Sequence, residues 1–284
     1  QLGDGTSVSS SVPVKVEGVE DVAAVAAGFF FSLALKNDGT VWAWGDNAFG
    51  ELGNGTKTAS SVPVLVKDLS SAISVSAGGH HALALLEDGS VVAWGYNGLG
   101  QLGDGSVVDS CIPVTVAGLT GVKDISGGYY HSAAIKEDGT AWTWGCNEMG
   151  QLGNGTDSES RVPVQVTGLV SVRCVACGYY HTTALGETGI LYSWGLNTLG
   201  QLGTGTFGHY ESAQTMTFME NVKKIAGCLR HSVAIKDDGT VWTWGNNSSG
   251  QLGNGTMQNS NRPIQVPGIT DAAGIASGTG NHTL

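Results

Sequence analysis

The tetrapeptide Trp-Gly-x-Asn recurs along the chain at intervals of 50 residues. It begins at Trp44, Trp94, Trp144, Trp194 and Trp244. A fixed period of roughly 20 to 50 residues indicates an array of similar units, each packed against its neighbours. Side chains that recur in every unit are therefore expected to hold the fold together, whereas side chains that occur in one unit are free to carry a function.

One repeat predicts four antiparallel strands. In the first complete unit they are expected at residues 22–27, 32–36, 41–45 and 62–66. The turn before the third strand contains Asp38-Gly39, which suits a tight hairpin because glycine adopts positive φ angles. Pro63 suits an outer strand, since proline cannot donate a ladder hydrogen bond. Repeated four-stranded units of this kind predict an all-β fold, a β-propeller.

The repeats account for nearly the whole chain, so we expect a single propeller domain over residues 1–284. Five units are complete: 22–66, 72–116, 122–166, 172–218 and 222–266. An orphan outer strand at 12–16 and a partial blade at 272–284 bring the total to about six blades' worth. The chain begins and ends within a unit, which we interpret as a fragment of a longer repeat protein.

All eight tryptophans lie in the expected third strands. Burial of one aromatic side chain removes about 150–250 Å² from water, which contributes at most roughly 4–6 kcal/mol. These rings are therefore expected to fill the space between adjacent blades.

The charge balance limits the classes of partner. The chain has 24 acidic and 13 basic residues, for a net charge of −11. Such a surface repels nucleic-acid phosphates and attracts a basic protein. The sequence contains no apolar run of the roughly 18 residues that a membrane-spanning helix needs. We therefore expect a protein partner, for which the charge favours a basic one, with no direct nucleic-acid binding and no membrane span.

No residue pattern indicates catalysis, a metal site or a cofactor. A histidine recurs at His81, His131, His181 and His231, and we interpret it as a turn-fixing hydrogen-bonding residue, because one copy per blade suits a structural role. Cys174 and Cys177 form a C-x-x-C, but on a strand positions three apart point to opposite faces, which favours core packing. We predict that the protein is not an enzyme.

The repeats resemble those of the regulator of chromosome condensation family. Residues 128–156 contain G-x-x-H-[ST], DGT, WG-x-N and QLG-x-G in a fixed order. The resemblance implies a propeller, commonly of seven blades. Seven units would need about 350 residues, so we expect an incomplete seven-blade ring. The family also implies that the first strand of each blade lines the central axis.

The most informative variable positions are the two residues after the glycine between the first and second strands. We predict a partner-binding surface there, around the mouth of the central channel, because aromatic residues and arginine dominate interface energetics. Its candidate residues are Phe29, Phe30, His80, Tyr129, Tyr130, Tyr179, Tyr180, Leu229 and Arg230. The function that this predicts is a non-enzymatic scaffold for protein–protein interaction.

Two alternatives remain. Guanine-nucleotide exchange on a small GTPase is the role of the founding family member, but it uses an inserted wedge, and no unit here has an insertion. Inhibition of a bacterial enzyme such as a β-lactamase is suggested by similarity in repeat style to propeller-type inhibitors.

Overall fold

The computed structural model describes residues 1–276 and 282. These residues contain twenty strands in five antiparallel sheets of four, and the strand order in every sheet follows the chain. The first strands are β1 (Val22–Ala27), β5 (Ala72–Ala77), β9 (Val122–Gly127), β13 (Val172–Cys177) and β17 (Val222–Gly227). The second strands are β2 (Phe31–Lys36), β6 (His81–Leu86), β10 (His131–Lys136), β14 (His181–Gly186) and β18 (His231–Lys236).

The third and fourth strands complete each blade. The third strands are β3 (Val41–Gly45), β7 (Val91–Gly95), β11 (Ala141–Gly145), β15 (Leu191–Gly195) and β19 (Val241–Gly245). The fourth strands are β4 (Ser60–Leu65), β8 (Ser110–Thr115), β12 (Ser160–Gln165), β16 (Tyr210–Thr215) and β20 (Ser260–Gln265). The four strands predicted for the first unit are confirmed to within two residues at each end.

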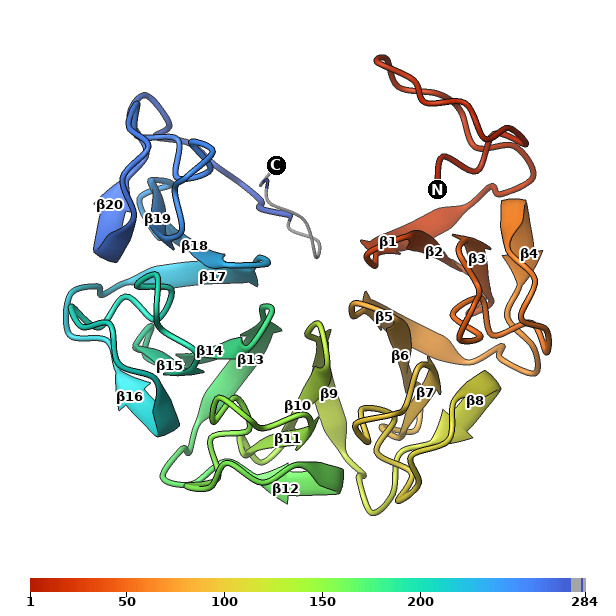
Figure 1. Ribbon diagram of the computed structural model, residues 1–284, viewed down its shortest axis with the longest axis horizontal. Helices are drawn as coiled ribbons and strands as arrows, with labels where there is room; N and C mark the ends of the chain where they lie inside the picture. The colour runs from red at the N-terminus through yellow and green to blue at the C-terminus, as the bar shows by residue number, and fades with distance from the viewer. Residues whose placement is uncertain (277–281, 283–284) are drawn as a thin grey trace.

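The five sheets are arranged as blades around a common axis (Figure 1). The first strand of each blade lies nearest the axis and the fourth lies at the periphery, so the predicted propeller is confirmed. Among the described residues, the arc of strands is open between the first and fifth blades. Strand β1 borders this opening, and Val22 and Val25 are consequently 42% and 73% exposed.

The third-strand tryptophan of each Trp-Gly-x-Asn motif locks its blade onto the preceding one. Trp94, Trp144, Trp194 and Trp244 are completely buried. Each indole N–H donates to a backbone carbonyl of the preceding blade, as Trp144 does to Gln101 at 2.9 Å. The predicted filling between blades is confirmed for these rings. Trp142 and Trp242 are half-buried instead, and they pack at the margins of the core clusters.

The recurring histidines join blades, and the prediction that they fix turns was wrong. His81 Nε2 lies 2.9 Å from Ser132 Oγ of the next blade, and the Ser132 hydroxyl donates to the Gln101 carbonyl at 2.8 Å. Since that hydroxyl has one proton, His81 must donate from Nε2. His131 contacts Thr182, and His181 contacts Ser232, in the same way.

The recurring asparagines hold the long loop between the third and fourth strands. Asn147 Oδ1 accepts the Leu152 N–H at 2.9 Å, and its amide donates to the carbonyls of Thr156 and Ser158 at 2.9 Å. The side chain thereby satisfies three backbone groups that have no ladder partner. This arrangement positions Gln151, whose carbonyl accepts the Trp194 indole N–H.

Both ends of the described chain extend the blade pattern. The Gln1 carbonyl accepts the Trp44 indole N–H at 2.8 Å, so residues 1–5 take the place of a preceding blade's long loop. Residues 12–16, expected as an outer strand, form no strand because no third strand lies beside them. Of the expected partial blade 272–284, residues 272–276 lie at a first-strand position, where the Ala272 N–H donates to the Gly239 carbonyl. The remainder, except residue 282, lies outside the described residues.

Candidate protein-binding face

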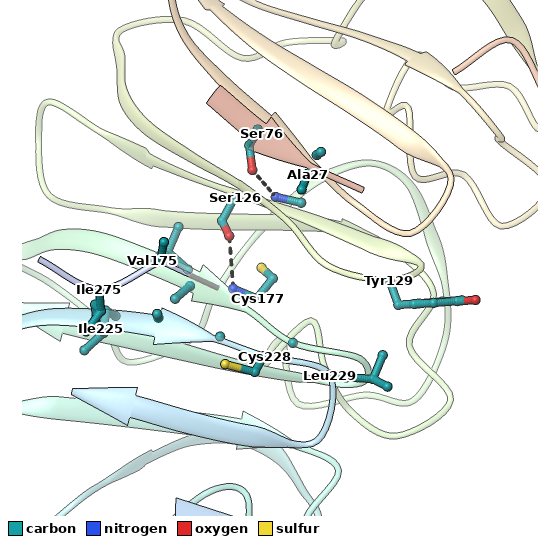
Figure 2. Close-up of a pocket in the computed structure, with 18 of the residues that line it drawn as sticks. Ala27, Ser76, Ser126, Tyr129, Val175, Cys177, Ile225, Cys228, Leu229 and Ile275 are labelled. Atoms are coloured by element: carbon teal, nitrogen blue, oxygen red, sulfur yellow. Dashed lines mark hydrogen bonds between the residues drawn. The ribbon is translucent and has the colours of Figure 1, made fainter. Parts of the chain in front are cut away.

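The inner strands of all five blades line a central cavity of about 330 Å³. Its walls are mostly small or apolar residues, such as Ala27 and Val175 (Figure 2). Ser76 accepts the Gly127 N–H and Ser126 accepts the Cys177 N–H, at 2.9 and 3.0 Å, so these hydroxyls link adjacent inner strands. Of the predicted residues, Tyr129, Tyr179 and Leu229 line this cavity, and Figure 2 shows Tyr129 and Leu229 at one end of it.

A belt of backbone hydrogen bonds runs from blade to blade at this end. The N–H of Phe29 donates to the Gly79 carbonyl, and Gly79 donates in turn to Gly128. Tyr129 donates to Gly178, and Tyr179 donates to Leu229, at 3.0–3.1 Å. The belt fixes the turns between the first and second strands at one level, so the variable side chains of successive blades lie side by side.

These side chains form one continuous cluster, which we call the aromatic patch. Neighbouring rings in it have centroids 4.3–6.4 Å apart, mostly in edge-to-face or tilted arrangements. Such geometry stabilises aromatic pairs beyond the effect of burial alone. The patch contains Phe29, Phe30, Phe49, His80, Tyr96, Tyr129, Tyr130, Tyr179, Tyr180 and Arg230.

The members of the patch differ in exposure. Phe29 and Phe30 are 38% and 44% exposed, whereas Tyr129 is only 9% exposed. Tyr129 lies at the centre, with its ring against the backbone of Gly79, where a Cβ atom would lie 3.0 Å from the Tyr129 ring. Burial, together with the nearby Tyr130 and Tyr179, raises the pKa of Tyr129 to about 12. Tyr129 is therefore mainly a support for the rings around it.

Blade five contributes differently from the others. Leu229 lies in the lining of the central cavity, not in the ring contacts of the patch. The guanidinium of Arg230 lies over the Tyr179 ring, 5.5 Å from its centroid. A cation in this position is attracted by the negative face of the ring. The predicted residues therefore lie at the same end of the propeller but differ in their surroundings. Phe29 and Phe30 are exposed, Tyr129 is buried at the centre of the patch, and Leu229 lines the central cavity.

Three residues of this face were missed by the sequence interpretation. Phe49 and Tyr96 come from the long loops, and Phe49 contacts both His80 and Tyr96, at 5.4 and 5.0 Å between centroids. Glu51 is completely buried beneath them, where the later blades have glutamine. Its position within the repeated QLG motif concealed it, although the substitution of glutamate for glutamine is visible in the sequence.

The groups capable of chemistry are dispersed. Within residues 1–276 and 282, no three histidine, cysteine or acidic side chains lie close enough together to hold a metal ion. Cys174 and Cys177 pack into different core clusters, and burial raises the pKa of both thiols to about 12. Burial also raises the pKa of Asp124 to about 6, although the Val175 N–H donates to its carboxylate. In the same residues, no helix is long and apolar enough to cross a membrane.

Sequence comparison matches the chain to one family over most of its length. Residues 1–174 match the model of the RCC1-like domain. Residues 188–235 and 238–284 match the repeat of the regulator of chromosome condensation (RCC1), and a second model of that repeat matches residues 172–201 and 222–251. No curated protein matches the chain in sequence.

Solved structures share the arrangement of the blades. Human WBSCR16 superposes with a TM-score of 0.83 at 25% identity, covering 94% of this chain and 72% of that protein. Prp20p from Saccharomyces cerevisiae, reported with its binding properties to Gsp1p and histones, superposes with a TM-score of 0.70 at 20% identity, covering 90% of this chain and 80% of that one. Yeast Prp20 was also solved with Kap60 bound, and that structure superposes with a TM-score of 0.70 at 20% identity over 92% and 79% of the two chains.

Proposed function

Because the chain belongs to the RCC1 repeat family, we propose that it is a non-enzymatic scaffold that binds a protein partner through the aromatic patch. The observation that carries the proposal is the continuity of the patch. Side chains that differ from blade to blade meet in one layer, whereas the tryptophan and asparagine positions repeat without change. Repetition indicates a structural role, and a continuous variable surface is available for recognition.

The composition of the patch suits an interface. Tryptophan, tyrosine and arginine are enriched among the few residues that account for most of the binding energy in protein complexes. Tyr130, Tyr180 and Arg230 remain partly or fully exposed, and their backbone carbonyls accept N–H groups from the residues that follow the third strands of their own blades. A surface ordered before binding loses little conformational freedom when a partner binds. The acidic net charge favours a basic partner.

The test compares two ends of the propeller. The double variant Tyr130→Ala/Tyr180→Ala should lose the specific partner recovered by affinity purification and mass spectrometry from the source cells. Phe218→Ala is the matched control, because Phe218 is 45% exposed and lies in a connection between a fourth and a first strand. Retention of the partner by the double variant, or equal loss in the control, would contradict the proposal.

Guanine-nucleotide exchange is the second candidate. Prp20p, with the same blade arrangement, was reported with binding to Gsp1p. The repeat spacing here is the same in every complete unit, so the chain offers no inserted wedge. A nucleotide-release assay with a Ran-type GTPase discriminates between the candidates: acceleration by this protein would favour exchange over a scaffold role.

A further inference from the structure

One junction of the aromatic patch combines aromatic rings with a buried carboxylate. It consists of Phe49, Glu51, His80, Tyr96 and Tyr129, contributed by three consecutive blades, and we call it the Glu51 junction. Glu51 Oε2 accepts the Phe49 N–H at 2.9 Å. Its other oxygen, Oε1, lies 3.3 Å from His80 Nδ1. The buried carboxylate thus lies between the Phe49 backbone and the His80 ring.

The same positions in the later blades form an internal comparison. At the position of Glu51 these blades have Gln101, Gln151 and Gln201, which are also completely buried. Gln101 Oε1 accepts the Leu99 N–H just as Glu51 accepts that of Phe49. The glutamine therefore fulfils the structural role of this position without a charge. The carboxylate of Glu51 is not required by the repeat.

The rings at this junction are also specific to it. Later blades have Leu99, Met149 and Leu199 at the position of Phe49, and Cys146, Leu196 and Asn246 at the position of Tyr96. Only at the Glu51 junction do aromatic residues at both positions coincide with a carboxylate. Burial of a carboxylate is unfavourable unless a cationic or hydrogen-bonding partner compensates for it, and for Glu51 the Phe49 N–H and the His80 ring provide this compensation.

We infer that the Glu51 junction binds a cationic side chain, arginine or lysine, from a basic segment of the partner. A cation placed against the rings of Phe49 and Tyr96 would be attracted by the rings. At longer range it would also be attracted by the buried carboxylate of Glu51. The net charge of −11 is complementary to such a segment. The patch already accommodates one cation, because the Arg230 guanidinium lies over the Tyr179 ring. The inference rests on the proposed function and identifies the chemistry that its surface recognises.

The experiment uses an arginine pentapeptide, acetyl-Gly-Ser-Arg-Ser-Gly-amide, and the same peptide with citrulline, which has nearly the same shape but no charge. Titration of the full chain is followed by NMR. The arginine peptide should shift the Phe49 amide and the His80 imidazole signals, and the citrulline peptide should not. Glu51→Gln, which introduces the residue of later blades, should weaken binding of the arginine peptide about tenfold, because it removes the negative charge beneath the rings.

Glu17→Gln is the matched control, since it removes the same charge from an exposed side chain and should leave the affinity unchanged. Melting temperatures verify that both variants fold. Equal binding of the two peptides, or unchanged affinity in Glu51→Gln, would overturn the inference.

Capture of the partner reports separately on the proposed function. If the partner is captured in a Tyr130- and Tyr180-dependent manner but the arginine peptide does not bind, the inference fails and the proposed function stands. If the arginine peptide binds at Phe49 but the partner is captured independently of Tyr130 and Tyr180, the proposed function fails instead.

Discussion

At the scale of single residues, pairs of side chains in neighbouring blades are replaced together. Between the second and third blades, His81 contacts Ser132. Between the first and second blades, the same two positions are occupied by Phe31 and Ala82. Phe31 packs against Gly28 as His81 packs against Gly78, with ring atoms close to the position of a glycine Cβ. Replacing both members together avoids a buried polar group without a partner, which is the costly situation.

Removing one member of such a pair should therefore destabilise the fold more than removing both. Ser132→Ala leaves the His81 Nε2–H without an acceptor and should lower the free energy of unfolding by about 1–3 kcal/mol. The double variant His81→Phe/Ser132→Ala reproduces the Phe31–Ala82 pair and should recover most of that loss. Guanidinium unfolding of the three proteins measures the coupling. Additive losses would show that the two side chains act independently.

At the scale of an element, the long loop of one blade is a binding site for the next. The Gln151 carbonyl accepts hydrogen bonds from both Trp194 and Thr182, at 2.8 and 2.9 Å. This loop has no ladder of its own, so its shape depends on Asn147. One asparagine thus connects the conformation of a loop to the packing of two sheets.

Asn147→Ala should consequently loosen the next blade as well as its own loop. Loss of its three hydrogen bonds leaves the buried Leu152 N–H unsatisfied, and hydrogen exchange of Leu152 and of the Trp194 indole should accelerate by at least about tenfold. Asn246→Ala, in a half-exposed loop position, is the control. Faster exchange at Leu152 alone, with the Trp194 indole unaffected, would refute the link between loop and blade.

The elements were largely predictable from the sequence, and the site only in part. Alternating apolar residues and Asp-Gly turns determine the strands, because both signals are local. Exposure at the channel mouth depends on contacts between residues 50 positions apart, so the burial of Tyr129 by Phe29, His80 and Tyr179 was not predictable. The interblade role of His81 was hidden for the same reason, since its partner is 51 residues away.

At the scale of the whole molecule, the buried histidines make stability depend on pH. Burial lowers the pKa of His81, His131 and His181 to about 3, and neighbouring imidazoles contribute. In each ring Nδ1 has no hydrogen-bond partner among the described residues, so a second proton would be buried without an acceptor. Between about pH 6.5, the usual pKa, and pH 3, the unfolded chain binds more protons than the folded one, and stability falls as pH falls.

Acidification from pH 7 to about 4.5 should therefore lower the free energy of unfolding. The variant His131→Phe/Thr182→Ala, which introduces a copy of the Phe31–Ala82 pair, should take up about one proton fewer on unfolding in this range.

Asp124 affects the pH dependence of stability in the opposite direction, because its raised pKa stabilises the folded state below about pH 6. Asp124→Asn should therefore make the free energy of unfolding fall more steeply on acidification. Denaturant titrations at several pH values test both slopes, and a variant slope equal to that of the parent would exclude His131 as a source.

The indole locks also impose a direction on the chain. In each one the accepting carbonyl precedes its tryptophan by 43 residues, from Gln1 and Trp44 to Gln201 and Trp244. During synthesis on the ribosome, the tryptophan of each Trp-Gly-x-Asn motif thus emerges after the loop that it will bind. Each new blade of a nascent chain can therefore pack against the long loop of a blade that has already been synthesised, before the carboxyl-terminal half of the chain is complete.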